Sequence, residues 1–220
     1  MAHIHHQPDP RAAHPPATRG RLIRWARYYD SSVSILTLGH RQQLRQATVA
    51  LARIQPGARV LEVGCGTGDV ALVASRQVGS SGAVYGIDAA PEMIAVAQAK
   101  AARMGVAVDL QVGLIESLAF PDASFDVVLS SLMMHHLPDD LKRQGLAESA
   151  RVLKPGGRLL IVDIKRPTSR LERALGHVLF HGGMRIGVQD LSPLLRAAGF
   201  TAVEAGETGF PMLGFVRGQK

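Results

Sequence analysis

A short apolar run that breaks into glycines constrains the fold of this chain more than any other stretch. Residues 60–68 read Val-Leu-Glu-Val-Gly-Cys-Gly-Thr-Gly. This pattern is typical of a buried strand that turns sharply into a loop, where glycines let a ligand approach the backbone closely. A helical pattern follows at residues 69–78, and the free N–H groups of its first turn would face the same loop. The stretch therefore predicts a strand-turn-helix unit that binds a polar, closely fitting ligand.

An acidic residue ends the next apolar run. Residues 84–87 read Val-Tyr-Gly-Ile, and Asp88 follows them. A second parallel strand would end here beside the first, where a carboxylate can accept hydrogen bonds from two ribose hydroxyls. The two features together indicate a nucleoside-containing ligand. They are also compatible with a dinucleotide-dependent oxidoreductase, which uses a similar glycine run.

Patterns typical of helices and of strands alternate along the chain. Strands are expected at residues 60–63, 84–88, 107–112, 126–130, 158–163, 201–207 and 212–216. Helices are expected at residues 44–54, 69–78, 91–104, 139–153 and 192–198. This alternation predicts an α/β fold with a mostly parallel sheet and helices on both faces. Only a short link joins the last two strands, so they are expected to pair antiparallel.

Three further stretches follow the glycine turn in a specific order. Ile-Glu-Ser-Leu at 115–118 and Phe-Pro-Asp-Ala-Ser-Phe-Asp at 120–126 follow the third strand, and Arg-Val-Leu-Lys-Pro-Gly-Gly at 151–157 precedes the fifth. With Glu62, they resemble the class I S-adenosylmethionine-dependent methyltransferases, in the branch that includes the ubiquinone/menaquinone-biosynthesis C-methyltransferases. The resemblance covers residues 45–217. It implies a Rossmann-like domain with a seven-stranded sheet and a reversed last strand, and it weighs against the oxidoreductase.

The resemblance also implies a cofactor, S-adenosylmethionine, which leaves as S-adenosylhomocysteine. It implies that the three glycines of the turn lie under the methionine part of the cofactor and that Asp88 binds its ribose. Ile115 and Glu116 would lie beside the adenine, and Ser130 would lie on the other side of the cofactor. Where many relatives have an Asp that accepts from the adenine, this chain has Leu114. The full set expected to contact the cofactor is Glu62, Gly64, Cys65, Gly66, Gly68, Asp88, Ala89, Met93, Ile115, Glu116, Ser130 and His135.

Three side chains are candidates for catalysis. His135 and His136 follow the fourth strand, at the edge where open α/β sheets bind ligands, and could act as a general base. Along an extended segment only one of them could point inward, and ordinary loop hydrogen bonds or a contact with the cofactor are alternative roles. Tyr29, with Asp30, resembles a Tyr-Asp pair of the N-terminal lid in this branch, where the Tyr approaches the cofactor. Alternatively, Tyr29 is an aromatic side chain that only packs the lid.

The chain is expected to form a single domain with three attached segments. Residues 1–18 are rich in His and Pro and predict a disordered tail. Residues 19–56 predict a helical lid, residues 57–220 the methyltransferase domain, and residues 165–188 within it a substrate cap. The cap holds His177 and His181 one turn apart, but no acid or Cys clusters nearby, so no metal site is expected. The only cysteine, Cys65, excludes an internal disulfide.

The net charge of +7 comes entirely from the beginning of the chain. Residues 1–60 hold nine Arg and two acids, whereas residues 61–220 hold sixteen basic and sixteen acidic side chains. The amphipathic pattern at 19–38 therefore has two interpretations, a lid or a contact with an anionic membrane. We expect a cytoplasmic protein, because the chain shows neither a signal peptide nor a membrane-spanning run. If the membrane interpretation holds, the protein would bind peripherally to the inner membrane face.

The sequence leaves the methyl acceptor open. A small-molecule or lipid acceptor is expected, with a quinone precursor or a phospholipid amine favoured. The alternatives are O- or N-methylation of a soluble metabolite, and a non-catalytic module that binds S-adenosylmethionine. Nucleic acid is not expected as a substrate, because no Asn-Pro-Pro-Tyr-type motif follows the fourth strand.

Overall fold

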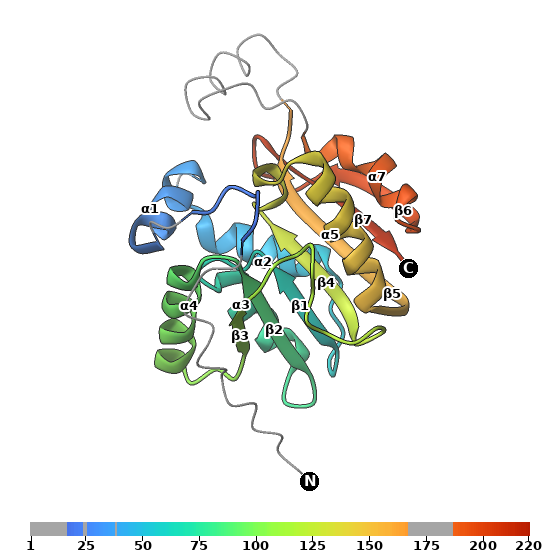
Figure 1. Ribbon diagram of the computed structural model, residues 1–220. Coiled ribbons are helices and arrows are strands. Elements are labelled where there is room, and N and C mark those ends of the chain that lie inside the picture. Colours follow the sequence, from blue (N-terminus) through green and yellow to red (C-terminus); the bar gives the residue numbers. More distant parts are fainter. Residues whose placement is uncertain (1–16, 24–25, 38, 167–186) are drawn as a thin grey trace.

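The computed structural model describes residues 17–23, 26–37, 39–166 and 187–220, which form an α/β fold around one sheet (Figure 1). The sheet has seven strands in the order β3-β2-β1-β4-β5-β7-β6. The strands are β1 Arg59–Val63, β2 Ala83–Asp88, β3 Asp109–Val112, β4 Phe125–Ser131, β5 Leu153–Ile164, β6 Thr201–Glu207 and β7 Leu213–Gln219. The first five pair in parallel, and β7 pairs antiparallel with both β5 and β6. The predicted fold class, with its reversed last strand, is confirmed.

Helices cover both faces of the sheet, as the apolar strands require. The helices are α1 Ala26–Leu36, α2 Arg41–Leu51, α3 Asp69–Val78, α4 Pro91–Met104, α5 Asp139–Val152 and α7 Ser192–Ala197. One buried cluster joins the sheet to α2, α3 and α4, for example through Leu44 and Ala97. The other joins the opposite face to α5 and α7, through Leu146 and Leu195. Helix α1 lies at the rim of the first layer, where Val33 joins the same buried cluster and Ala26 packs against Met93 at the start of α4 (Figure 1).

Most element boundaries agree with the sequence patterns within a few residues, but two were predicted wrongly. Helix α5 ends at Val152, and β5 begins at once and runs through the Pro155–Gly157 turn that was expected to separate them. Leu153 pairs with Phe125, and the register then shifts so that Arg158 pairs with Val127. The intervening residues form a bulge, which allows proline and glycines inside a strand.

The second error concerns the N-terminal lid. The helical pattern was expected to begin at Arg19, but α1 begins at Ala26, and residues 18–23 have no helical structure. Residues 24 and 25 lie outside the described part, as do the tail up to residue 16 and the cap segment at 167–186 with its two histidines. The proposed division into tail, lid and domain stays a prediction. Within the described residues, no helix has both the length and the apolar character needed to cross a bilayer.

Arg151 of α5 fixes the loop that precedes β4. Its guanidinium donates to the backbone carbonyls of Leu118 at 2.9 Å and Phe120 at 2.8 Å. It also donates to Glu148 at 2.7 Å, while Glu148 accepts from the backbone N–H of Leu118 at 2.8 Å. One side chain thus satisfies several backbone groups of a loop that has no regular structure of its own.

We expect Arg151→Met to lower the free energy of unfolding by about 2 kcal/mol, since it removes charge-assisted hydrogen bonds and leaves two carbonyls without their donor. Urea unfolding measures this change. Arg143→Met, on an exposed position of the same helix, is the matched control and should be close to neutral. Equal midpoints for the two variants would show that Arg151 does not hold the loop.

Candidate functional site

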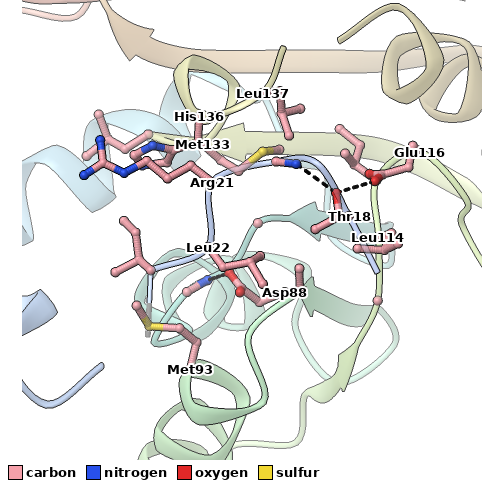
Figure 2. A pocket seen from close by; sticks show the side chains of 18 of the residues that line it. Thr18, Arg21, Leu22, Asp88, Met93, Leu114, Glu116, Met133, His136 and Leu137 are labelled. Carbon is pink, nitrogen blue, oxygen red and sulfur yellow. Dashed lines mark hydrogen bonds between the residues drawn. The ribbon is translucent and has the colours of Figure 1, made fainter. Parts of the chain in front are cut away.

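An open pocket lies at the carboxyl ends of β1, β2 and β4 (Figure 2). The space that it encloses, together with the solvent at its open mouth, is about 650 Å³. The predicted site residues that line it are Tyr29, Gly64, Gly66, Asp88, Ala89, Met93, Ile115, Glu116 and His136. Those that do not line it are Glu62, Cys65, Gly68, Ser130 and His135.

The three glycines of the turn have different reasons to be glycine. All have positive φ, at 69° for Gly64, 52° for Gly66 and 80° for Gly68, a conformation that side chains with a Cβ rarely adopt. A Cβ at Gly68 would lie 2.9 Å from the Cβ of Ala97, and one at Gly64 would lie 2.2 Å from Met133. Gly68 therefore allows α4 to pack closely, whereas Gly66 is buried next to Tyr29 and lines the pocket.

Asp88 joins the glycine turn to the start of α4. One carboxylate oxygen accepts from the backbone N–H of Gly66 at 2.8 Å, and the other accepts from that of Ala90 at 2.9 Å. Burial raises the pKa of Asp88 above its ordinary value, and the two backbone N–H groups act in the opposite direction. A carboxylate can accept about four hydrogen bonds, so each oxygen retains the capacity to bind a ligand hydroxyl.

Three predicted residues lie behind the turn instead of in the pocket. Glu62 is 2% exposed, and its Oε2 has no hydrogen-bond partner within the described residues. Burial raises its pKa to about 8, although the Arg45 charge lowers it. Cys65 is buried against Gly86, and burial raises the pKa of its thiol, so it is a packing residue. Ser130 is buried in β4, and its hydroxyl also lacks a partner among the described residues.

The segment at 18–23 crosses the mouth of the pocket. The Thr18 hydroxyl donates to Glu116 at 2.6 Å, as the dashed line in Figure 2 shows. The backbone N–H of Arg21 donates to the carbonyl of His136 at 3.1 Å, and Leu22 lines the pocket. Arg19 forms an exposed ion pair with Asp140. The chain therefore closes the side of the pocket on which Glu116 lies.

Helix α1 is tied to the glycine turn by a charged network. The Thr67 hydroxyl donates to Asp30 at 2.6 Å, and Lys100 donates to Asp30 at 2.5 Å and to Asp69 at 2.8 Å. The neighbouring Tyr29 lies over the turn, since a Cβ at Gly66 would be 3.4 Å from its ring. Burial raises the pKa of Tyr29 to about 12. Tyr29 is therefore a neutral phenol at physiological pH, able to donate a proton in a hydrogen bond.

The two histidines do not follow the extended segment that was expected, but only one of them, His136, lines the pocket. They lie in a 3₁₀ turn, η1 Met134–His136. Their ring centroids are 3.9 Å apart, with 47° between the planes. His136 lines the pocket, whereas His135 lies behind it and bonds Asp163 through Nδ1 at 2.6 Å. Burial and the neighbouring His135 lower the pKa of His136 to about 4, so its ring is neutral at physiological pH.

Several residues of this region were missed by the sequence analysis. Thr18 reaches the pocket from the predicted tail and Arg21 from the predicted lid helix, and no local pattern marks their contacts. Leu132 and Met133 line it from the turn after β4. Asp163 carried a usable signal, because it is an acid at the carboxyl end of an apolar strand, as Asp88 is. Among the described residues, no group of three or more His, Cys, Asp or Glu side chains could hold a metal ion.

The sheet order and the pocket at its carboxyl edge define a class of α/β proteins that bind nucleotide-containing ligands. A family model described as a methyltransferase domain matches residues 60–157. The ubiquinone/menaquinone biosynthesis C-methyltransferase of Geobacter sulfurreducens is 38% identical over 145 residues, 65% of this chain and 56% of the relative. The 2-phytyl-1,4-naphtoquinone methyltransferase of Synechococcus elongatus is 34% identical over 166 residues, 74% of this chain and 70% of the relative. The chain belongs to the S-adenosylmethionine-dependent methyltransferase family, which confirms the resemblance.

Solved structures support the same fold. A SAM-dependent methyltransferase from Aquifex aeolicus superimposes with a TM-score of 0.69, over 86% of this chain and 97% of that one, at 24% identity. At this identity the likeness concerns the fold alone. The chain spans 56% and 65% of the length of the first two curated relatives it matches.

Proposed function

We propose that the chain binds S-adenosylmethionine in this pocket and transfers its methyl group to a small-molecule or lipid acceptor. The observation that carries the proposal is the link between Asp88 and Gly66. A carboxylate that can accept from ribose hydroxyls is bonded to the N–H of a glycine that lines the pocket. One ligand that contains a sugar and an amino-acid part would meet both, and the apolar Met93 and Ile115 would contact its base.

When bound, S-adenosylmethionine supplies a methyl group on positively charged sulfur, which is already activated for displacement. The chain then has to position the acceptor in line and exclude water. The segment at 18–23 and Tyr29 close the pocket on one side. His136 lines the pocket and would take the proton that an acceptor loses, as an unprotonated ring that the lowered pKa of about 4 makes a weak base. Gly64 and Gly66 would hold the cofactor's amino-acid part.

Among acceptors we favour a quinone precursor in its reduced form. Relatives at 34–38% identity are named as methyltransferases of ubiquinone, menaquinone and phytyl-naphthoquinone biosynthesis. The pocket wall formed by Leu22, Leu132, Met133 and Leu137 is apolar, as a flat aromatic ring requires. A phospholipid amine and a soluble metabolite are the alternatives.

The test is transfer of a tritiated methyl group from S-adenosylmethionine to a demethylated naphthoquinol, with phospholipids and soluble phenols as parallel acceptors. We expect label in the methylated naphthoquinol. Label in another acceptor would contradict the quinone assignment but would still show that the chain is a methyltransferase. Cofactor binding without label in any of them would favour the non-catalytic module.

Asp88→Ala should weaken S-adenosylmethionine binding by about 10- to 100-fold, because a hydrogen bond to a charged group contributes roughly 1.5–3 kcal/mol. Calorimetry on both proteins gives the dissociation constants. Asp109→Ala removes an exposed acid from β3 and is the control for the loss of one charge. Unchanged affinity in Asp88→Ala would remove Asp88 from the site.

We further propose that α1 touches an anionic lipid surface from which such an acceptor would come. Tyr28 and Ile35, seven residues apart on one face, are 71% and 77% exposed. Residues 1–60 hold nine Arg and two acids. Arg45 is buried and Arg41 pairs with Asp30, and each remaining Arg near the surface would add an attraction of about 1 kcal/mol. Helix α1 also lies beside the pocket, through Tyr29.

Sedimentation with anionic vesicles at low salt tests this proposal. We expect the wild type to sediment, less so at high salt because the attraction is screened. The double variant Tyr28→Ser/Ile35→Ser should sediment less, whereas Met104→Ser, at a 45% exposed position outside α1, should behave as wild type. If the wild type ignores the vesicles at low salt, α1 is a lid only and a soluble acceptor is favoured.

A further inference from the structure

The turn after β4 has an unusual backbone that the neighbouring strand holds in place. Leu132 has φ of 56°, which is uncommon for a bulky side chain and strains the backbone. Its N–H donates to the carbonyl of Val162 at 2.9 Å. The next residue of β5, Asp163, accepts from the backbone N–H of His135 at 3.1 Å. The end of β5 therefore fixes both the strained residue and the start of the histidine pair.

Asp163 is a buried carboxylate, and two of its three hydrogen bonds come from His135 in this turn. It is 2% exposed. Besides the backbone N–H of His135, it accepts from Nδ1 of the same residue at 2.6 Å and from the backbone N–H of Ile164 at 2.7 Å. A carboxylate in this position accepts only, so Nδ1 of His135 carries a proton. The bond fixes both the tautomer and the plane of the His135 ring.

The fixed ring of His135 is in turn the neighbour of His136. The 3.9 Å between centroids leaves no space for another group between the rings. On the other side, the backbone of Arg21 donates to the His136 carbonyl. The charged and titratable groups that act on His136 come from three elements: His135 in its own turn, Asp163 in β5 and Arg21 in the N-terminal segment.

We propose that Asp163 is a positioning residue for methyl transfer, which acts through His135 to hold the His136 ring in the pocket as the proton acceptor. The inference rests on the proposed function and adds a residue that does not line the pocket. In the step it serves, a bond forms between the acceptor atom and the methyl carbon, and the carbon-sulfur bond breaks with its electron pair moving to sulfur. The acceptor's proton passes to a ring nitrogen of His136.

The test compares Asp163→Asn with Asp126→Asn. Asp126 also accepts from a backbone N–H, that of Arg59 at 2.8 Å, and from a side chain, Lys154 at 2.7 Å, but it lies at the other end of β4. Both variants remove one negative charge and retain the side-chain volume. With the demethylated naphthoquinol, we expect Asp163→Asn to lower kcat by about 10- to 100-fold, less than the roughly 10²–10⁴-fold that a general base contributes. The dissociation constant of S-adenosylmethionine should stay within about twofold, and Asp126→Asn should keep both constants.

A double variant separates positioning from a general structural effect. If Asp163 acts through His136, the loss caused by Asp163→Asn should disappear in a His136→Gln background, because the two residues act as a unit. The same factor in both backgrounds would overturn the proposal. His135→Gln, which keeps both backbone bonds of Asp163, should give the same result as Asp163→Asn and serves if the latter fails to fold.

A spectroscopic measurement decides the question without any acceptor. In ring ¹H–¹⁵N spectra we expect the Nδ1 proton of His135 to be protected from exchange in the wild type and in Asp126→Asn, and to be lost in Asp163→Asn. The ring signals of His136 should shift or broaden in the same variant. Unchanged His136 signals would contradict the positioning role. A failure of the quinol assay together with the expected spectra would instead remove the acceptor assignment alone.

Discussion

Replacing Gly66 by valine should abolish S-adenosylmethionine binding while the domain stays folded. The backbone at Gly66 has φ of 52° and faces the pocket, where an added side chain would occupy the space between the turn and Tyr29. The conformational cost of a non-glycine residue at positive φ is roughly 1–2 kcal/mol, below the total stability of a typical domain. The lost space, in contrast, lies where the ligand has to approach the backbone.

The measurement is calorimetric titration with the cofactor, together with urea unfolding. Gly105→Val is the matched control, because Gly105 ends α4 with φ of 63° and a Cβ there would meet nothing within 4 Å. It carries the same backbone strain without touching the pocket. We expect both variants to lose similar stability and only Gly66→Val to lose binding. Retained affinity in Gly66→Val would show that the turn is not the ligand's contact surface.

The second large effect concerns Glu62 and pH. Burial raises its pKa from 4.5 to about 8 in the folded state. Between these two values the folded state binds more protons than the unfolded one, so the free energy of unfolding falls as pH rises. Below pH 4.5 the contribution of Glu62 is constant, and above pH 8 the full penalty is present. The shift corresponds to a loss on the order of 5 kcal/mol across this window.

Glu62→Gln should remove this pH dependence, because glutamine is a neutral group of the same shape. Urea unfolding of the apoprotein at pH 5, 6.5 and 8 measures it. We expect the variant to be similar to wild type at pH 5 and more stable at pH 8. Glu92→Gln, at an exposed position in the first turn of α4, is the control. Parallel curves for wild type and Glu62→Gln would show that the buried carboxyl is not protonated in the folded state.

The sheet could be predicted because its signals are local. Apolar runs such as residues 126–130 appear as strands in the sequence, and a proline at position 91 with glycine at 105 marks a helix start and stop. The bulge after Leu153 could not be predicted, since it depends on pairing with Phe125, a residue far away in the chain. The start of α1 was missed because the apolar spacing that suggests a helix also serves a segment whose side chains line a pocket.

The candidate site likewise combines features with a local sequence signal and contacts between residues far apart in the chain. The glycine turn and Asp88 carry their signals within a few residues, and the structure brings Gly66 and Asp88 together through one hydrogen bond. The contact between Thr18 and Glu116 joins residues 98 positions apart, and nothing in either local pattern indicates it. The position of His136 in the pocket depends on a turn with a strained Leu132, whereas an extended segment is the default expectation after a strand.

A crystal structure with S-adenosylhomocysteine would decide whether this pocket is the cofactor site. We expect the ligand at the carboxyl edge of the sheet, with its ribose hydroxyls within hydrogen-bonding distance of Asp88, its base beside Ile115 and its amino-acid part against Gly64 and Gly66. An empty pocket at saturating ligand, or a ligand bound elsewhere on the molecule, would contradict the assignment.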